Sequence, residues 1–393
     1  MCRSIIRITK YLSVIMAVMA LTLVAGPASA SGWDQVKKPI TQVYSSGVSK
    51  KHATFVGLNP YFKKLDKISG SKFKTKSYPG GMLFKIKVAL KGLTDGGCDS
   101  SCIVVSYHPA ELPVTNLITD SLLNFSDPVA TSGATCELMS LNSGLFEKEH
   151  KKANVYMFGS YATTAYELHS RKEANSLEGI KGLKVRAGGA AHVRFVKGLG
   201  MVPVALATAE AYEALMRGTL DGCMGAMDFQ RSFGFWDVAK NVLMVNAGVF
   251  NGVPTPTFRR DWFDKLPKVA KRALVANYAM VPAMTTIDGY VKKSELVKKE
   301  AVKKGTKILE PDAGLKKAIA EFIKKDTDGL VAMAAEKRGI DKALAAKVIN
   351  TYLKLYQKWL TISQKEIKNN TAKFIQALNR EVYNPLIEKM GLN

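Results

Sequence analysis

The 393-residue sequence has few cysteines, and it lacks the short motifs that identify common enzyme classes. Five cysteines are too few for a disulfide scaffold of this length. No G-x-S-x-G elbow, P-loop, H-E-x-x-H helix or dinucleotide fingerprint occurs. The histidines, at positions 52, 108, 150, 169 and 192, show no ligand-like spacing. We therefore predict a protein that is not an enzyme, with no cofactor and no zinc site; the sequence leaves open whether a metal ion assists ligand binding. An exported hydrolase whose triad is assembled from distant residues stays as an alternative.

Acidic residues are also scarce, since 33 Asp and Glu stand against 57 Lys and Arg and leave a net charge of +24. Such basicity suggests a nucleic acid or an anionic membrane as partner. A nucleic-acid interface would show a basic stripe with interleaved aromatic residues. Here the lysines spread along the whole chain and concentrate in amphipathic helices, where they are solvated surface by default. We expect no nucleic-acid partner.

No acid occurs among the first 30 residues, and this segment has the order of a secretory signal peptide. Basic residues at positions 3, 7 and 10 precede an apolar run over 11–25 and the small residues 28–30. The run is short for a bilayer and ends in Gly26-Pro27, which argues against a membrane anchor. No later stretch has the length and apolarity of a span. We predict cleavage after Ala30 and a periplasmic mature chain.

Four cysteines follow this segment, at positions 98, 102, 136 and 223. An exported chain meets an oxidising compartment, and four thiols allow three complete pairings. Cys98 and Cys102 are the local candidate for a disulfide. Four reduced, partly buried thiols are the alternative.

Strand and helix patterns alternate along the chain, and the alternation restarts once. The first set has strands over 40–44, 72–78 and 102–107, with helices over about 51–68 and 83–93. The second has strands over 154–158, 183–186, 202–206 and 220–224, with helices over about 191–199 and from Thr208. Such alternation predicts an α/β fold class with two α/β units.

The C-terminal part changes character and is Lys-rich and helical from about Val291. Apolar residues recur at spacings of 4, 4, 3 and 4, which places them on one face of a long helix: Leu344, Val348, Tyr352, Leu355 and Trp359. We expect a long helical C-terminal region.

The segment Ser176–Asp221 carries the most specific pattern in the chain. It reads S-L-E-G-I-K-G-L-K-V-R-A-G-G and later K-G-L-G-M-V-P-V-A-L-A-T-A-E-A-Y-E-A-L-M-R-G-T-L-D-G. This resembles the DctP-type solute-binding proteins of TRAP (tripartite ATP-independent periplasmic) transporters. Three flanking pieces agree with that family: Tyr78-Pro79-Gly80-Gly81, the run F-W-D-V-A-K-N-V at 235–242, and Trp262 with Leu266-Pro267.

The resemblance implies two α/β domains with mixed sheets joined by hinge strands, as in periplasmic binding proteins. Domain I would comprise 31–160 and 251–290, and domain II would comprise 161–250 and 291–393, including the C-terminal helices. It further implies a receptor that captures a small carboxylate by hinge closure and delivers it to the small and large permease subunits. An exported receptor serving an ABC importer or a sensor is the alternative within this class.

Arg186 ends a predicted strand, so its side chain should emerge at the carboxyl edge of the sheet, where open α/β sheets bind ligands. A guanidinium there can hold a carboxylate through two parallel hydrogen bonds. The resemblance implies that Arg186 pairs with the ligand's carboxylate. The alternative is an ordinary surface arginine on an edge strand.

Other positions depart from the family pattern. Tyr166 stands where a second arginine is common, Thr208 where an aromatic residue is common, and Met224-Gly225 where a Glu-Asn pair is common, with Asp228 close behind. These departures speak against a sialic-acid-like or C4-dicarboxylate ligand and suit a larger or less charged carboxylate.

Loops after the strands and aromatic residues complete the candidate site. The predicted ligand-binding set is Arg186, Tyr166, Tyr107, Ser106, Ser46, Phe229, Asp228 and Phe250. Further candidates are Ser45, His108, Phe125, Tyr161, Trp236 and Asn251, whereas Glu210, Tyr212 and Asp221 fit the family motif in structural roles.

Overall fold

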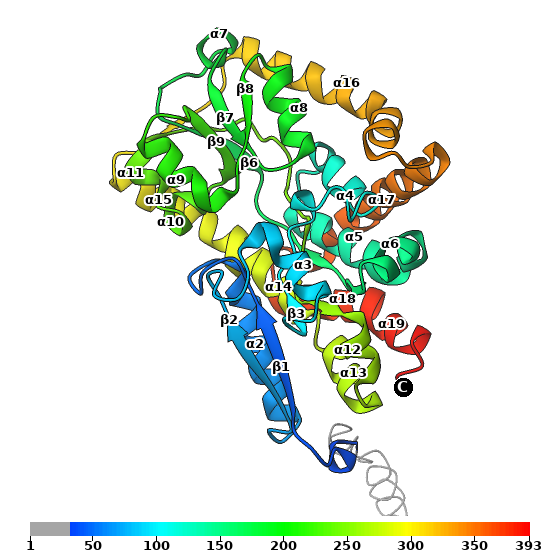
Figure 1. Ribbon diagram of the computed structural model, residues 1–393. Coiled ribbons are helices and arrows are strands. Elements are labelled where there is room, and N and C mark those ends of the chain that lie inside the picture. The colour runs from blue at the N-terminus through cyan, green and yellow to red at the C-terminus, as the bar shows by residue number, and fades with distance from the viewer. Residues whose placement is uncertain (1–31) are drawn as a thin grey trace, which may run out of the picture.

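Two mixed β-sheets and a set of long helices organise residues 32–393, the part of the chain that the computed structural model describes (Figure 1). The predicted signal peptide lies outside these residues. The first sheet lies towards the lower end of Figure 1 and the second towards its upper end. None of the helices described combines the length and apolar character that a membrane span requires.

The first sheet has the strand order β2-β1-β3-β12-β4. Strands β1 (Ile40–Ser45), β2 (Phe73–Tyr78) and β3 (Ser100–Ser101) are parallel, and helices α2 (Thr54–Ile68) and α3 (Ala89–Thr94) connect them. Strand β12 (Thr257–Arg259) runs antiparallel between β3 and β4 (Val155–Tyr156). The predicted β-α-β-α-β order is therefore confirmed, and a distant segment completes the sheet.

The apolar run 102–107, predicted as a strand, is not one in the structure. Only Ser100–Ser101 pair in β3, and Val105–Tyr107 form a 3₁₀ turn. The backbone N–H groups of Ile103 and Val105 donate to the carbonyls of Pro254 and Gly252. The run is apolar because it is buried against this second segment, and a strand pattern alone does not distinguish the two situations.

The second sheet has the order β13-β10-β6-β9-β7-β8. Strands β7 (Lys184–Ala187), β8 (Val202–Ala205) and β9 (Gly222–Ala226) are parallel, as predicted, with α8 (Ala190–Gly198) and α9 (Thr208–Met216) between them. Strand β6 (Tyr166–Ser170) runs antiparallel between β9 and β10 (Asn241–Leu243), and β13 (Lys307–Leu309) adds to the edge.

Three segments connect the two sheets. Strands β5 (Ser160–Tyr161) and β11 (Val253–Pro254) pair antiparallel where the chain passes between the sheets. The third connection is a continuous helical run: α14 (Met280–Met284), a π-helical segment η6 (Thr285–Val291) and α15 (Lys292–Lys303). At its start α14 packs on α2, and at its end α15 packs on α10 (Phe229–Ser232) beside the second sheet.

The C-terminal helices are α16 (Ala313–Arg338), α17 (Lys342–Ile362), α18 (Thr371–Leu378) and α19 (Asn384–Lys389). Helix α17 packs against α5 (Pro128–Leu141), and the predicted apolar face is the buried one. Trp359 lies on Gly133 of α5, where a Cβ would meet the indole at 2.2 Å, and its Nε1 donates to Glu137.

The sequence-based division groups 291–393 with the second domain and stays a prediction. In the structure, α17 contacts α5, α18 contacts α14, and α19 contacts α13 (Lys268–Ala276). These partners belong to the ranges assigned to the first domain. Long-range packing of this kind leaves no trace in a local helical pattern.

All four cysteines of residues 32–393 are buried and free, so Cys98 and Cys102 do not form a disulfide in this structure. Strand β3 lies between these two cysteines. An extended stretch of four residues spans about 13 Å, beyond the roughly 7 Å limit for a disulfide.

Candidate functional site

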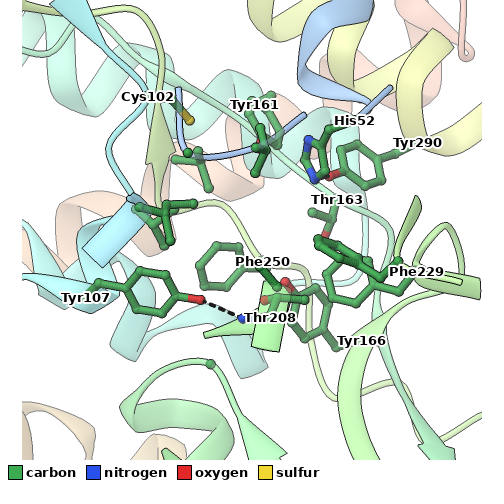
Figure 2. Close-up of a pocket in the computed structure, with 18 of the residues that line it drawn as sticks. His52, Cys102, Tyr107, Tyr161, Thr163, Tyr166, Thr208, Phe229, Phe250 and Tyr290 are labelled. Carbon is green, nitrogen blue, oxygen red and sulfur yellow. Dashed lines mark hydrogen bonds between the residues drawn. The ribbon is translucent and has the colours of Figure 1, made fainter. Parts of the chain in front are cut away.

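A cavity lies where the two sheets and the connecting segments meet (Figure 2). Its wall combines residues from loops of the first sheet, the connections and the second sheet, among them His52, Tyr107, Tyr161, Thr163, Tyr166, Arg186, Thr208, Phe229, Phe233, Phe250 and Tyr290. The enclosed space of about 60 Å³ holds only a few water molecules. The opposite walls therefore lie close together.

Arg186 is held in one orientation at the end of β7. Its Nε donates to the carbonyl of Leu206 at 2.8 Å, Nη1 to that of Met224 at 3.4 Å and Nη2 to the Tyr107 hydroxyl at 3.0 Å. The side chain is only 1% exposed. All three hydrogen-bond partners are uncharged, so the guanidinium is fixed in place without a counter-ion among them.

Gly188, two residues after Arg186, lets the backbone approach the guanidinium. A Cβ at this position would lie 2.8 Å from Nη2 and 2.9 Å from Nη1 of Arg186. Either the guanidinium or the backbone would have to shift to accept it. The Ala187-Gly188-Gly189 turn after the strand thus shapes the arginine's pocket.

The positive charge of Arg186 is uncompensated within the wall. Within the part of the chain that the structure describes, no acid lines the cavity. Burial lowers the pKa of the lining residue His52 to about 4, so this imidazole is neutral at pH 7. Burial raises the pKa of the Tyr166 phenol and brings that of the Cys223 thiol to about 11. Both neighbours are therefore protonated at neutral pH. A buried cation without a counter-ion is energetically costly.

Aromatic rings are the largest group of side chains in the remaining wall. The Tyr166 ring stacks on His192 at 4.7 Å with an interplanar angle of 5°, and on Phe250 at 5.5 Å and 22°. Tyr161 and Tyr290 stack at 5.8 Å and 18°. Figure 2 shows Phe250 near the middle of the cavity, with Tyr107 and Thr208 on one side and His52 and Tyr290 on the other.

Contacts join the two sides of the cavity directly. The Ser106 hydroxyl donates to the Gly188 carbonyl at 2.8 Å, and the Tyr107 hydroxyl accepts from Arg186 and from the Thr208 backbone N–H at 3.4 Å. At the surface, Lys87 and Glu210 form an ion pair at 3.7 Å. These contacts bring loops of the first sheet directly against the second sheet.

The structure places five of the eight predicted ligand-binding residues in the wall: Arg186, Tyr166, Tyr107, Phe229 and Phe250. The other three lie beside it. Ser46 is buried and accepts from the Val48 N–H at 3.3 Å, and Ser106 uses its hydroxyl on Gly188. Asp228 is buried, burial raises its pKa, and its Oδ2 has no partner in the described chain.

Most of the further candidates lie away from the cavity, although Tyr161 does line it. Phe125 packs in the core between Tyr352 and Tyr356, and Trp236 lies under the Lys304 ammonium at 4.8 Å. Ser45 and His108 are buried outside the lining, and Asn251 donates to Thr135. Glu210, expected in a structural role, forms the ion pair with Lys87 across the cavity.

The prediction missed His52, Phe233 and Tyr290 in the wall. Tyr290 lies in η6, and π-helical segments often mark functional sites, but the sequence pattern there predicts only a helix. His52 precedes α2 with no motif around it. Residues 32–393 contain no group of three or more His, Cys, Asp or Glu placed to hold a metal ion.

Comparison with known proteins gives one family. Residues 44–332 match the family model described as bacterial extracellular solute-binding protein, family 7 (DctP). A curated solute-binding protein of Albidiferax ferrireducens is 27% identical over 208 residues, which are 52% of this chain and 60% of that protein. The match thus spans less than two thirds of the relative's length.

Solved structures share the fold. A TRAP solute-binding protein of Rhodoferax ferrireducens T118, in complex with copurified benzoate, has a TM-score of 0.71 at 15% identity, covering 82% of this chain and 99% of its own. A sugar-acid-binding protein of Advenella mimigardefordensis, in complex with galactonate, has a TM-score of 0.70 at 18% identity, covering 81% and 99%.

Proposed function

The chain belongs to the DctP family of TRAP solute-binding proteins, family 7 of the bacterial extracellular solute-binding proteins, and we propose that it captures a small organic acid between its two sheets. The observation that carries this proposal is Arg186, a buried cation at the cavity whose hydrogen-bond partners are all uncharged. A carboxylate supplies the missing counter-charge.

The donor count of Arg186 supports a carboxylate as the bound group. A guanidinium has five N–H donors, and three of them serve Leu206, Met224 and Tyr107. One donor remains on each terminal nitrogen, which is the pair that a carboxylate accepts through two parallel bonds. The Tyr107 hydroxyl already accepts twice, so its own O–H is free to donate to the same acid.

The relatives support an acid without selecting one. Benzoate and galactonate each carry a single carboxylate, but one has an apolar ring and the other a chain of hydroxyls. In this chain the same fold would hold the acid by Arg186, and the rest of the wall would decide which body fits.

Closure of the two halves on the acid follows from the placement of its contacts. Arg186 belongs to the second sheet and Tyr107 to a loop of the first, so an acid held by both makes contacts that exist only in the closed form. A ligand shifts a conformational equilibrium by that differential contact. The β5–β11 pair and η6 would serve as the hinges.

The partners and location follow from the family. The closed, loaded receptor would dock on the small and large membrane subunits of a TRAP permease, in the periplasm that the predicted signal peptide indicates. A receptor serving an ABC importer or a sensor is the alternative. Adjacent genes for the two TRAP membrane subunits would favour the permease.

A thermal-shift screen of carboxylic acids tests the proposal. The protein is first unfolded and refolded to remove copurified solute. A ligand at a hundred times its Kd adds about 2.7 kcal/mol of stability. Arg186→Met should abolish the shift, whereas Arg217→Met, which changes an exposed arginine of the same half, should keep it. The proposal fails if no acid shifts the wild type, or if the Arg186→Met protein responds equally.

A further inference from the structure

Apart from Arg186, aromatic rings and small apolar residues make up most of the cavity wall. His52, Tyr161 and Tyr290 lie at one end, and Tyr166, Phe229 and Phe250 surround the middle. Phe233, only half buried, closes one side against Phe229 at 4.8 Å and His52 at 5.9 Å between ring centroids. Such surfaces favour flat apolar groups, because rings pack on rings in offset or edge-to-face geometry.

Several polar atoms of this wall already have hydrogen-bond partners within the protein. The Thr54 hydroxyl donates to the Tyr161 hydroxyl at 2.9 Å and lies 2.8 Å from His52 Nδ1. His52 Nε2 lies 3.5 Å from the Tyr290 hydroxyl, and the Thr163 hydroxyl donates to the Thr164 carbonyl at 2.7 Å. A solute rich in hydroxyls would lose its hydrogen bonds to water and find few replacements here.

The wall also offers nothing to a second carboxylate. Of the lining residues within 32–393, only Arg186 is permanently charged, and His52 is neutral at pH 7. A second anionic group would be buried among aromatic rings without a counter-charge, which is strongly unfavourable. The wall therefore discriminates between acids by the ring or chain attached to the carboxylate as well as by the number of carboxylates.

We propose that the solute is a monocarboxylate with a flat, apolar body, for which aromatic acids are the simplest examples. This rests on the proposed function, because Arg186 must hold the carboxylate. The ring would lie among Tyr166, Phe229, Phe233 and Phe250. The enclosed space of about 60 Å³ is smaller than the roughly 150 Å³ cavity known to hold benzene, so the ring enters while the halves are apart and the half-buried Phe233 and Tyr107 adjust around it.

Titration calorimetry with matched probes tests the proposal on the refolded full-length mature protein. Benzoate has one carboxylate and a flat ring, cyclohexanecarboxylate has the same size without flatness, terephthalate adds a second carboxylate, and gluconate replaces the ring by hydroxyls. We expect benzoate to bind at least tenfold more tightly than terephthalate and gluconate, and about threefold more tightly than cyclohexanecarboxylate.

A specificity variant separates recognition of the ring from folding. Phe233→Leu keeps an apolar residue at a half-buried position, so the fold should persist. It should weaken benzoate severalfold while changing cyclohexanecarboxylate little. A loss of stability alone would weaken both acids equally, so an unchanged ratio overturns the role of Phe233.

The two proposals fail in distinguishable ways. If gluconate or terephthalate binds as tightly as benzoate and the binding disappears in Arg186→Met, the inferred solute class is wrong and the acid receptor stands. If none of the four acids binds, the inferred class is also wrong. The wider screen of carboxylic acids then decides whether Arg186 binds acids at all.

Discussion

Replacing Arg186 by Met separates two roles that a buried arginine can have. The substitution keeps an unbranched side chain and removes the charge together with its donors to Leu206, Met224 and Tyr107. If the arginine exists to bind an acid, the ligand-free protein should tolerate its loss. If it stabilises the fold instead, as a member of an ion pair does, the free energy of unfolding should fall.

The structure predicts a small effect on stability, because two opposing contributions have similar size. Removing an uncompensated buried charge relieves a penalty of several kcal/mol. Losing three hydrogen bonds from a charged donor, one of them long at 3.4 Å, costs about 1.5–3 kcal/mol each at most. We expect the free energy of unfolding of Arg186→Met to stay within about 2 kcal/mol of the wild-type value.

Arg194 provides a matched comparison within the same half of the molecule. It is buried as well, but its Nε and Nη2 donate to the Asp326 carboxylate at 2.6 and 2.9 Å, and Asp120 lies 3.8 Å away. Removing one partner from a buried pair costs about 3–5 kcal/mol, since it leaves an unpaired charge. Arg194→Met should therefore destabilise the protein clearly more than Arg186→Met.

Urea unfolding followed by circular dichroism measures both variants after refolding without solute. Thermal shift with benzoate then reports binding, and we expect the response to be lost in Arg186→Met and kept in Arg194→Met at temperatures where the latter is folded. If both variants are destabilised equally, the interpretation that a bound acid supplies the counter-ion of Arg186 is refuted.

Three further outcomes are expected. Gly188→Ala should weaken benzoate binding about tenfold by displacing the guanidinium, with near-wild-type stability, and calorimetry checks this; an unchanged Kd would show that the guanidinium has room to move. Lys87→Glu or Glu210→Lys should each weaken benzoate binding by up to about fivefold at low salt, because this half-exposed ion pair would form only when the two halves close. The variant with both charges reversed should bind as the wild type does. Additive losses in that double variant would contradict a role of the ion pair. The free energy of unfolding should rise from about pH 5 and be greatest at about pH 7, which urea titrations at several pH values can measure. Between about pH 4 and 6.5 the unfolded chain binds more protons than the folded one, because burial lowers the pKa of His52, His150 and His169 to about 4 and that of His192 to about 3. Burial raises the pKa of Glu167 to about 8, so this group lowers the stability as the pH rises to that value. A stability that rises steadily up to pH 8 would contradict this prediction.

Much of the fold could be predicted from local patterns. Most of the alternation of strands and helices and the buried face of α17 follow from spacings of a few residues, and the structure confirms them. The strand predicted over 154–158 was counted with the second set, but it pairs with β12 in the first sheet, because pairing between distant segments is not visible in a local pattern. Strand β6 escaped prediction because its partners β9 and β10 lie more than fifty residues away and it inserts antiparallel between them. The 102–107 run was misassigned because burial against 252–254 produces the same apolar pattern as a strand.

The candidate site also contains residues whose position could be predicted from the sequence and others whose position could not. Arg186 could be located because a strand followed by Ala-Gly-Gly is a local signature, and the end of a strand determines where its side chain emerges. Ser46 and Ser106 were plausible from their loops, but their hydroxyls are used within the protein. Asp228 follows the motif closely in sequence, yet it is not among the residues that line the cavity.

The sequence by itself therefore determined the family and the alternation of strands and helices, and it selected Arg186 as the candidate for holding an acid. Only the tertiary structure decided what faces that arginine. His52, Tyr161 and Tyr290 come from segments more than a hundred residues apart, and no pattern of neighbouring residues links them. Periodicity records which side of an element is buried, whereas the identity of the surface that buries it depends on contacts between distant parts of the chain.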